Sequence, residues 1–164
     1  MTQPLLDVRG LRIAFGDKAV VRGIDFQIAP GEKLALVGES GSGKTVSALS
    51  LLGLVQDADI SGTAVFSDAL PGTGSRDLLA LPEQALRGIR GKEIAMVFQE
   101  PMTALNALFT VGDQIAEVLE LHEGLGKPAA REAAVQLLAD TGIPEPARRA
   151  RCFPHQLSGG QRQR

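Results

Sequence analysis

The sequence is short of several features that would point to particular classes of protein. It has a single cysteine, Cys152, so the chain cannot form an internal disulfide, which suits a reducing cytosol. Charged residues make up 22% of the chain and the net charge is -2, which gives no reason to expect a nucleic-acid partner held by bulk charge. The sequence also contains no internal repeat.

Hydrophobic runs of membrane-spanning length are missing too. The most apolar stretch, Val46 to Val55, is about half of the ~20 residues that a membrane helix needs. The segment Met1 to Asp7 lacks the basic and then apolar pattern of a signal peptide. With 164 residues, 44% of them hydrophobic, the sequence predicts a soluble chain the size of one ordinary domain, and any membrane role has to come through a partner.

The segment around which the chain is organised fits the pattern G-x-x-x-x-G-K-[ST] of the phosphate-binding P-loop. Its glycines let the backbone approach a polyphosphate without a Cβ in the way, and its free N–H groups form an anion nest at the positive end of the following helix. Lys44 is predicted to reach the β- and γ-phosphates, and the Thr45 hydroxyl to bind Mg²⁺. The loop consists of Gly38, Glu39, Ser40, Gly41, Ser42, Gly43, Lys44 and Thr45.

The sequence on either side supplies the strand and the helix that the motif requires. The apolar run Lys33–Val37 predicts a buried strand, and Val46–Leu54 predicts an apolar helix. A chance glycine-rich turn, the alternative, would not explain these two neighbours. We therefore expect a nucleotide-binding core.

Two strands precede this core. The alternating apolar residues of Leu5–Phe15 and Ala19–Ile28 predict an antiparallel pair that turns at Gly16-Asp17 and lies beside the core. Phe15 falls at the tip of this pair. It could stack on an adenine ring or be an ordinary core phenylalanine, and the local sequence leaves both interpretations open.

The remaining elements of the core follow the P-loop. We expect a strand at Ile60–Phe66, a surface loop at Ser67–Arg76 and a short helix at Pro82–Arg90 with the proline in its first turn. A second core strand is predicted at Lys92–Phe98, and it ends abruptly at Gln99-Glu100-Pro101.

The composition changes after Pro101. Apolar residues at helical spacing predict helices at Val111–His122 and Ala130–Thr141, separated by a break at Lys127-Pro128, and a short third helix at Pro144–Arg151. We therefore expect a nucleotide-binding core with its β subdomain over residues 1–100 and a helical subdomain over residues 101–164.

A second motif, LSGGQ, stands near the end of the sequence at Leu157–Gln161. Ser158 can cap the start of a helix, and Gly159 and Gly160 leave backbone N–H groups open to an anion. A capped helix without a ligand is the alternative. On its own LSGGQ is a modest signal, but after a P-loop in the same chain it becomes very specific.

These motifs together resemble the ATP-binding subunits of ABC transporters. The P-loop matches Walker A, Gln99 matches the Q-loop, LSGGQ matches the signature, and Phe15 falls where the family places its adenine-stacking aromatic residue. The strings Phe98–Asn106 and Phe153–Arg164 resemble the peptide, nickel and microcin C importer branch.

The resemblance implies an α/β fold: a RecA-like P-loop NTPase core with a small antiparallel β subdomain and a helical subdomain. It implies ATP and Mg²⁺ as cofactors, with Gln99 touching the metal ion and the attacking water, and Thr45 binding the same ion. ATP would lie between two such domains, and one of them would contribute its signature. The signature residues in this sequence are Ser158, Gly159, Gly160 and Gln161.

The partners implied are a second ATP-binding domain, transmembrane permease subunits and, indirectly, an extracytoplasmic solute-binding protein. The protein would then lie at the cytoplasmic face of the inner membrane and use ATP hydrolysis to drive import of peptides or related solutes. Two alternatives remain: a nucleotide-binding fragment that cannot hydrolyse ATP, and a soluble ABC ATPase that serves translation or DNA repair.

One departure from the family is large. The family's Walker B strand, catalytic glutamate, D-loop and switch histidine all follow the signature, whereas this sequence stops at Arg164. We therefore expect an amino-terminal fragment of a longer protein, inactive alone because phosphoryl transfer needs the missing groups. The missing strands should leave apolar residues partly uncovered, and we assign no catalytic role to either histidine. The apolar residues in question are Leu34, Leu36, Ile94 and Val97, and the histidines are His122 and His155.

Overall fold

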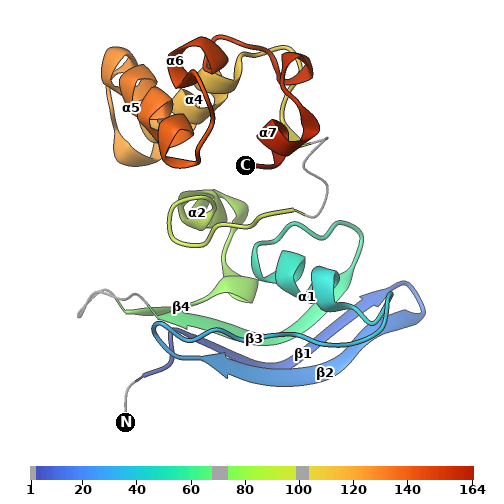
Figure 1. Ribbon diagram of the computed structural model, residues 1–164. Helices are drawn as coiled ribbons and strands as arrows, with labels where there is room; N and C mark the ends of the chain where they lie inside the picture. Colours follow the sequence, from blue (N-terminus) through green and yellow to red (C-terminus); the bar gives the residue numbers. More distant parts are fainter. Residues whose placement is uncertain (1–2, 68–73, 99–103) are drawn as a thin grey trace. The chain divides into compact units, whose positions relative to one another are not determined.

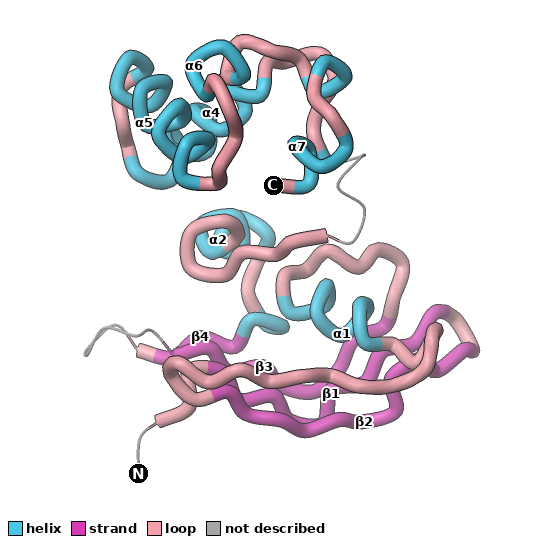
Figure 2. The backbone as a smooth tube through the Cα atoms, in the orientation of Figure 1, coloured by secondary structure: helices cyan, strands magenta, loops and turns pink. Residues whose placement is uncertain are grey.

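The computed structural model describes residues 3–67, 74–98 and 104–164 (Figure 1). The chain divides into two compact units, Met1–Arg90 and Gly91–Arg164. The first unit contains all of the described strands, and the second contains helices joined by loops (Figure 2). Within the described residues, no helix is long and apolar enough to cross a membrane.

A four-stranded antiparallel sheet forms the base of the first unit. Its strand order is β2-β1-β3-β4, so the predicted hairpin of the first two strands is confirmed, with its turn at Gly16-Asp17. Part of the predicted loop at Ser67–Arg76 is instead the short strand β4, which pairs with the end of β3, and residues 68–73 of that loop lie outside the described residues. The strands are β1 (Leu6–Phe15), β2 (Lys18–Ile28), β3 (Asp59–Ser67) and β4 (Ser75–Asp77).

A bulge in β1 explains why its apolar residues do not alternate strictly. Val8 and Leu11 are three residues apart, yet both are fully buried, because the pairing register shifts between them. Gly10 lies in this bulge with φ +57°, and its N–H donates a hydrogen bond to the Asp25 carboxylate. The extra residue therefore returns Ile13 to the buried side of the strand.

Helix α1 (Lys44–Leu51), the 3₁₀ turn η1 (Leu78–Ala80) and helix α2 (Glu83–Ile89) lie on one side of this sheet (Figures 1 and 2). Helices at the positions of α1 and α2 were predicted, and Pro82 is the residue that directly precedes α2. Buried side chains from the strands and from this layer form the core of the unit. They are Leu6, Val8, Leu11, Ile13, Val21, Leu52, Ala64, Phe66, Leu78, Leu86 and Ile89.

The two strands predicted for the nucleotide-binding core, at Lys33–Val37 and Lys92–Phe98, are wrong for this structure. Neither run belongs to a strand of the sheet in the described part of the chain, and the first run is exposed throughout. The physical reason is that a strand exists only through hydrogen bonds to a neighbour, and no described strand pairs with either run.

The prediction that apolar residues in these two runs stay partly uncovered is confirmed. Leu34 and Leu36 are each 42% exposed, and Val97 is 95% exposed. Ile94 is half-buried.

Within its described residues, the second unit contains two helices of 13 and 14 residues, two shorter helices and one 3₁₀ turn. The two long helices were predicted, but Lys127 and Pro128 begin the second of them rather than interrupting it, because proline is tolerated in a first turn. One core cluster of Val111, Leu138, Ile143, Ala150 and Leu157 joins the elements. The elements are α4 (Val111–Glu123), α5 (Lys127–Asp140), α6 (Pro146–Arg149), η2 (Pro154–Gln156) and α7 (Gly159–Gln163).

Candidate nucleotide-binding site

The P-loop wraps around the side chain of its own lysine. The Lys44 ammonium Nζ donates to the carbonyl oxygens of Gly38 at 2.7 Å and Glu39 at 2.6 Å, and to Ser42 Oγ at 3.2 Å. An ammonium has three donors, and all three are used here. The positive charge is thereby held within the loop, where an incoming polyphosphate would meet it.

Close packing explains two of the loop's glycines. Gly43 has φ +90°, and a Cβ built on it would lie 2.8 Å from Val21 Cγ2 of β2. A Cβ on Gly38 would lie 2.7 Å from Ser42 Oγ. Gly41 has φ +82° but open space around it, so only its backbone conformation favours glycine. The loop is therefore set by its backbone angles and by packing against β2.

Helix α1 begins directly after Gly43, and no side chain caps its first turn. Its first turn also carries no acidic residue. A helix start with uncapped N–H groups and an adjacent ammonium attracts an anion. The neighbouring residues Ser42 and Thr45 are exposed, so a ligand can reach them.

A magnesium ion at this site would depend on the nucleotide. The described residues contain no group of three or more His, Cys, Asp or Glu side chains that could hold a metal ion. Thr45 offers a single hydroxyl, which fits an ion that takes its other ligands from phosphate oxygens and water. Gln99, the other predicted metal and catalytic residue, lies outside the described residues.

Phe15 ends β1 at the tip of the hairpin, and 37% of its surface is exposed. It is therefore not fully enclosed in the core of its unit. An exposed aromatic ring at this place is available to a flat ligand.

The signature segment in the second unit is held by two kinds of contact. Leu157 is buried in the cluster that joins α4, α5 and the loop before α6. Ser158 caps α7 as predicted: its Oγ accepts from the N–H of Gln161 at 3.3 Å, while Gln161 Oε1 accepts from the N–H of Ser158 at 3.1 Å. Gly159 and Gly160 remain exposed, with open space around both.

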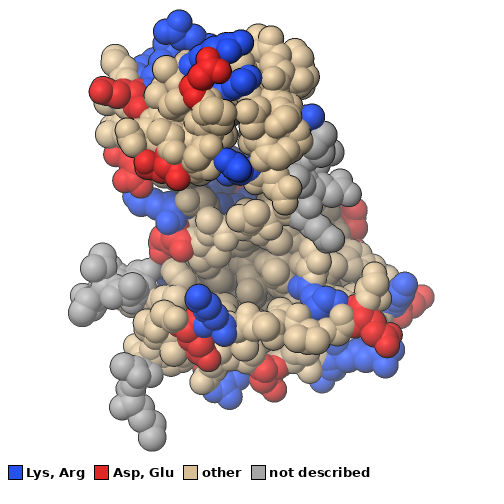
Figure 3. Space-filling view, in the orientation of Figure 1, with Lys and Arg blue, Asp and Glu red and all other residues tan. Residues whose placement is uncertain are grey.

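Charges of both signs are interspersed on each unit in the view of Figure 3. Several of them are paired, as in the contacts of Arg131 with Asp113 at 3.1 Å and Arg148 with Glu145 at 3.0 Å. The pKa of Asp113 lies below its usual value because the Thr110 hydroxyl donates to its carboxylate and, secondarily, because Arg131 is near.

The polar contacts at the end of α1, the helix that follows the P-loop, were not predicted from the sequence. Arg90 at the end of α2 donates to backbone carbonyls just after α1, and Glu83 holds its guanidinium. The spacing of Glu83 and Arg87 on one helix could have indicated their own ion pair. Nothing local indicated a contact between Arg90 and Leu52, because 38 residues separate them.

Comparison with known proteins identifies the family. The family described as ABC transporter matches residues 21–164. The chain belongs to the ABC transporter family. The curated relatives include the oligopeptide transport ATP-binding protein OppD of Mycobacterium tuberculosis, which is 49% identical over 167 residues, covering 98% of this chain and 26% of the relative.

Other relatives carry related names. The dipeptide transport ATP-binding protein DppD of Bacillus subtilis is 42% identical over 166 residues, covering 99% of this chain and 48% of DppD. The peptidoglycan transport ATP-binding protein YejF of Agrobacterium fabrum is 48% identical over 170 residues, covering 99% of this chain and 30% of YejF. The chain thus spans about half the length, or less, of the curated relatives that it matches.

Solved structures support the same fold. The dimeric structure of a post-hydrolysis state of the ATP-binding cassette MJ0796, bound to ADP and Pi, matches with a TM-score of 0.76 at 24% identity. The match covers 96% of this chain and 65% of the cassette chain. The expected fold class, an α/β P-loop NTPase, is confirmed even though the two core strands expected at Lys33–Val37 and Lys92–Phe98 are not formed in the described residues.

Proposed function

We propose that the chain is part of an ATP-binding subunit that powers an ABC importer of peptides or related solutes. The observation that carries the proposal is the P-loop, in which Lys44 is held by loop carbonyls at the uncapped start of α1. In this family such a loop is the Walker A motif, and ATP is the ligand that fits it.

The roles in nucleotide binding follow from chemistry. The Lys44 ammonium exchanges its contacts with Gly38, Glu39 and Ser42 for oxygens of the β- and γ-phosphates. Thr45 contributes its hydroxyl to Mg²⁺, and the exposed ring of Phe15 stacks on the adenine. The amides of the loop and of the first turn of α1 bind the remaining phosphate oxygens.

The signature would act on a second nucleotide. Ser158, Gly159 and Gly160 present a capped and exposed helix start, which suits ATP held by the P-loop of a second ATP-binding domain. We assign Gln99 to Mg²⁺ and the attacking water on the resemblance alone. Closure of two such domains on ATP would drive permease subunits at the cytoplasmic face of the membrane, with a solute-binding protein acting on the far side.

Hydrolysis is assigned to the full-length protein and not to these 164 residues by themselves. Phosphoryl transfer requires groups that bind the metal ion and orient the attacking water. The acids Glu39, Glu100 and Asp140 lie before the signature, whereas the family carries those groups after it. The names of the relatives favour a transporter subunit over a soluble ABC ATPase, because they refer to oligopeptide, dipeptide and peptidoglycan transport.

The proposal is tested by titrating Mg-ATP into the full-length protein and its Lys44→Ala variant. Loss of a charged hydrogen bond to phosphate costs ~1.5–3 kcal/mol, so Kd should rise about ten- to a hundredfold. Lys127→Ala is the matched control, since Lys127 is an exposed lysine at the start of α5 and outside the P-loop. Equal dissociation constants for all three proteins would refute the assignment of the P-loop.

A further inference from the structure

Helix α1 carries the P-loop lysine but has few means of holding itself together. It is eight residues long, far below the length at which isolated helices are stable. Its sequence includes Thr45, Val46, Ser47 and Ser50, which are weak helix formers. The Ser50 hydroxyl donates to the Ser47 carbonyl at 2.8 Å, a contact of the kind that slightly destabilises helices. Its geometry must therefore come from its surroundings.

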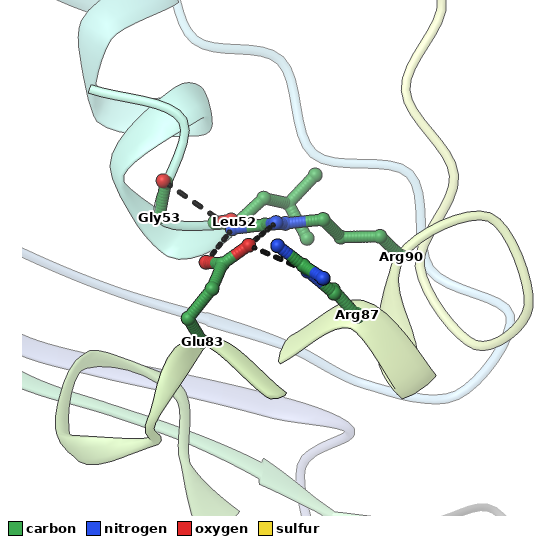
Figure 4. Close-up of polar contacts among 5 residues, drawn as sticks. All are labelled: Leu52, Gly53, Glu83, Arg87 and Arg90. Atoms are coloured by element: carbon green, nitrogen blue, oxygen red, sulfur yellow. Dashed lines mark hydrogen bonds and ion pairs between the residues drawn. The ribbon is translucent and has the colours of Figure 1, made fainter. Parts of the chain in front are cut away.

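The start of α1 lacks a side-chain cap, whereas its end is closed by backbone hydrogen bonds: the N–H groups of Gly53, which has φ +61°, and Leu54 donate to the carbonyls of Ser50 and Leu49. Gly43 supplies no side-chain cap at the start, and there is no basic residue in the last turn to balance the negative end of the helix dipole. A cation reaches the far end from elsewhere in the unit. Arg90 Nε donates to the Leu52 carbonyl at 2.7 Å, and its Nη2 donates to the Gly53 carbonyl at 3.3 Å (Figure 4).

Glu83 fixes the orientation of this guanidinium. Its two carboxylate oxygens accept from Nη1 of Arg90 at 2.7 Å and from Nη2 at 2.9 Å, the two-pronged geometry that aligns an arginine best (Figure 4). The contact with Arg90, followed by that with Arg87, lowers the pKa of Glu83. The Arg90 side chain is only 21% exposed, whereas that of Arg87 is 76% exposed and, among the described residues, donates only to Glu83.

The approach of α2 to the end of α1 is tight. A Cβ on Gly53 would lie 2.9 Å from Leu86 Cδ1 and 3.1 Å from Arg90 Nη2. Leu86 and Leu52 are both buried in the core of the unit. The Arg90 guanidinium therefore packs directly against the backbone of Gly53, where there is no room for a side chain.

We propose that Arg90, aligned by Glu83, is a positioning residue of the nucleotide site. It does not touch the ligand. It anchors the end of α1 and so holds the start of the same two-turn helix, and with it Lys44 and the first-turn amides, in the geometry that binds phosphate. This inference rests on the proposed function, because the geometry that Arg90 maintains affects binding only if the P-loop binds a nucleotide.

The test compares Arg90→Met with Arg87→Met in the full-length protein. Methionine keeps much of the aliphatic stem and removes the guanidinium, and Arg87 shares Glu83 without reaching α1. Kd for Mg-ATP is measured by calorimetry under conditions in which circular dichroism shows each protein fully folded. We expect Arg90→Met to raise Kd about three- to tenfold, and Arg87→Met to leave it unchanged within error.

A merely structural role predicts a different pattern. It would lower the denaturation midpoint of Arg90→Met but leave the Kd of the folded protein equal to that of Arg87→Met, and this result would overturn the inference. Should Arg90→Met fail to fold, Glu83→Gln replaces it, since it leaves Arg90 in place without its ionic partner. Its Kd should also exceed that of Arg87→Met, and equal values would overturn the inference.

Hydrogen exchange of the α1 amides and the Lys44→Ala variant separate this inference from the proposed function. If wild type binds and Lys44→Ala does not, the P-loop assignment stands and the Kd of Arg90→Met decides about Arg90. If wild type does not bind, the proposed function fails. Hydrogen exchange of the α1 amides then tests whether Arg90 holds α1 in place. Faster exchange across Lys44–Leu51 in Arg90→Met than in Arg87→Met supports the inference, and equal exchange overturns it.

Discussion

Replacing Gly43 by alanine should distort the P-loop through a single methyl group. The added Cβ would lie 2.8 Å from Val21 Cγ2 and 3.3 Å from the Val20 carbonyl oxygen. Overpacking of this kind costs ~1–3 kcal/mol, and the left-handed backbone at φ +90° costs an alanine roughly 1–2 kcal/mol more. The free energy of unfolding of the first unit should therefore fall by ~2–5 kcal/mol.

Gly41→Ala is the matched control for this effect. Gly41 lies in the same loop with a similar φ of +82°, but a Cβ there meets nothing within 4 Å. It should cost only the backbone term of roughly 1–2 kcal/mol, slightly reduced because alanine also restricts the unfolded chain. The difference between the two variants isolates the contact with Val21.

The assay is urea denaturation followed by circular dichroism, with Mg-ATP affinity measured alongside. Val21→Ala provides a second check, because truncating that side chain makes room for the new methyl group. In the double variant the two changes should cost less than the sum of their separate costs, since the clash is removed. Equal losses for Gly43→Ala and Gly41→Ala, or strict additivity in the cycle with Val21, would refute the packing argument.

Two further predictions concern the second unit. Thr110→Ala should lower the free energy of unfolding by ~1 kcal/mol, because Thr110 Oγ1 accepts from the N–H of Asp113 at the start of α4, and a shift in urea midpoint of that unit would measure it. Asp113 should make stability depend on pH: its pKa is lowered in the folded state, so its contribution is complete above the unfolded value near 3.8 and is lost as pH falls through the folded value. Wild type and Asp113→Asn should therefore differ in midpoint at pH 7 and converge as the pH falls below the folded pKa of Asp113, and a gap that does not narrow as the pH falls would contradict this assignment.

Features that depend on neighbouring residues in the sequence were predicted well. The P-loop and the Ser158 cap are defined by residues within one or two turns of each other, so their spacing alone indicated their geometry. The hairpin of β1 and β2 was predicted for the same reason, because a tight turn at Gly16-Asp17 joins two alternating strands. In each case, the physical interaction that fixes the structure is also short in sequence.

Features that depend on distant partners were not predicted. The run Lys33–Val37 has the composition of a buried strand, but composition does not supply the neighbour that a strand must pair with. The hydrogen bond from Arg90 to the Leu52 carbonyl is a second example. The two residues are 38 positions apart, and no sequence pattern connects them. Apolar periodicity indicates which face of an element is buried, but it does not say what covers that face.

The signature segment combines both kinds of interaction, and the combination explains its geometry. Its capping box is local, but α7 has only five residues, so a cap alone could not keep it formed. Leu157, one residue before the cap, adds burial against Val111 and Leu138, which lie far away in the sequence. The leucine therefore fixes the position of the segment and the serine fixes its conformation. The two glycines are left exposed at the helix start, where a phosphate can approach the backbone.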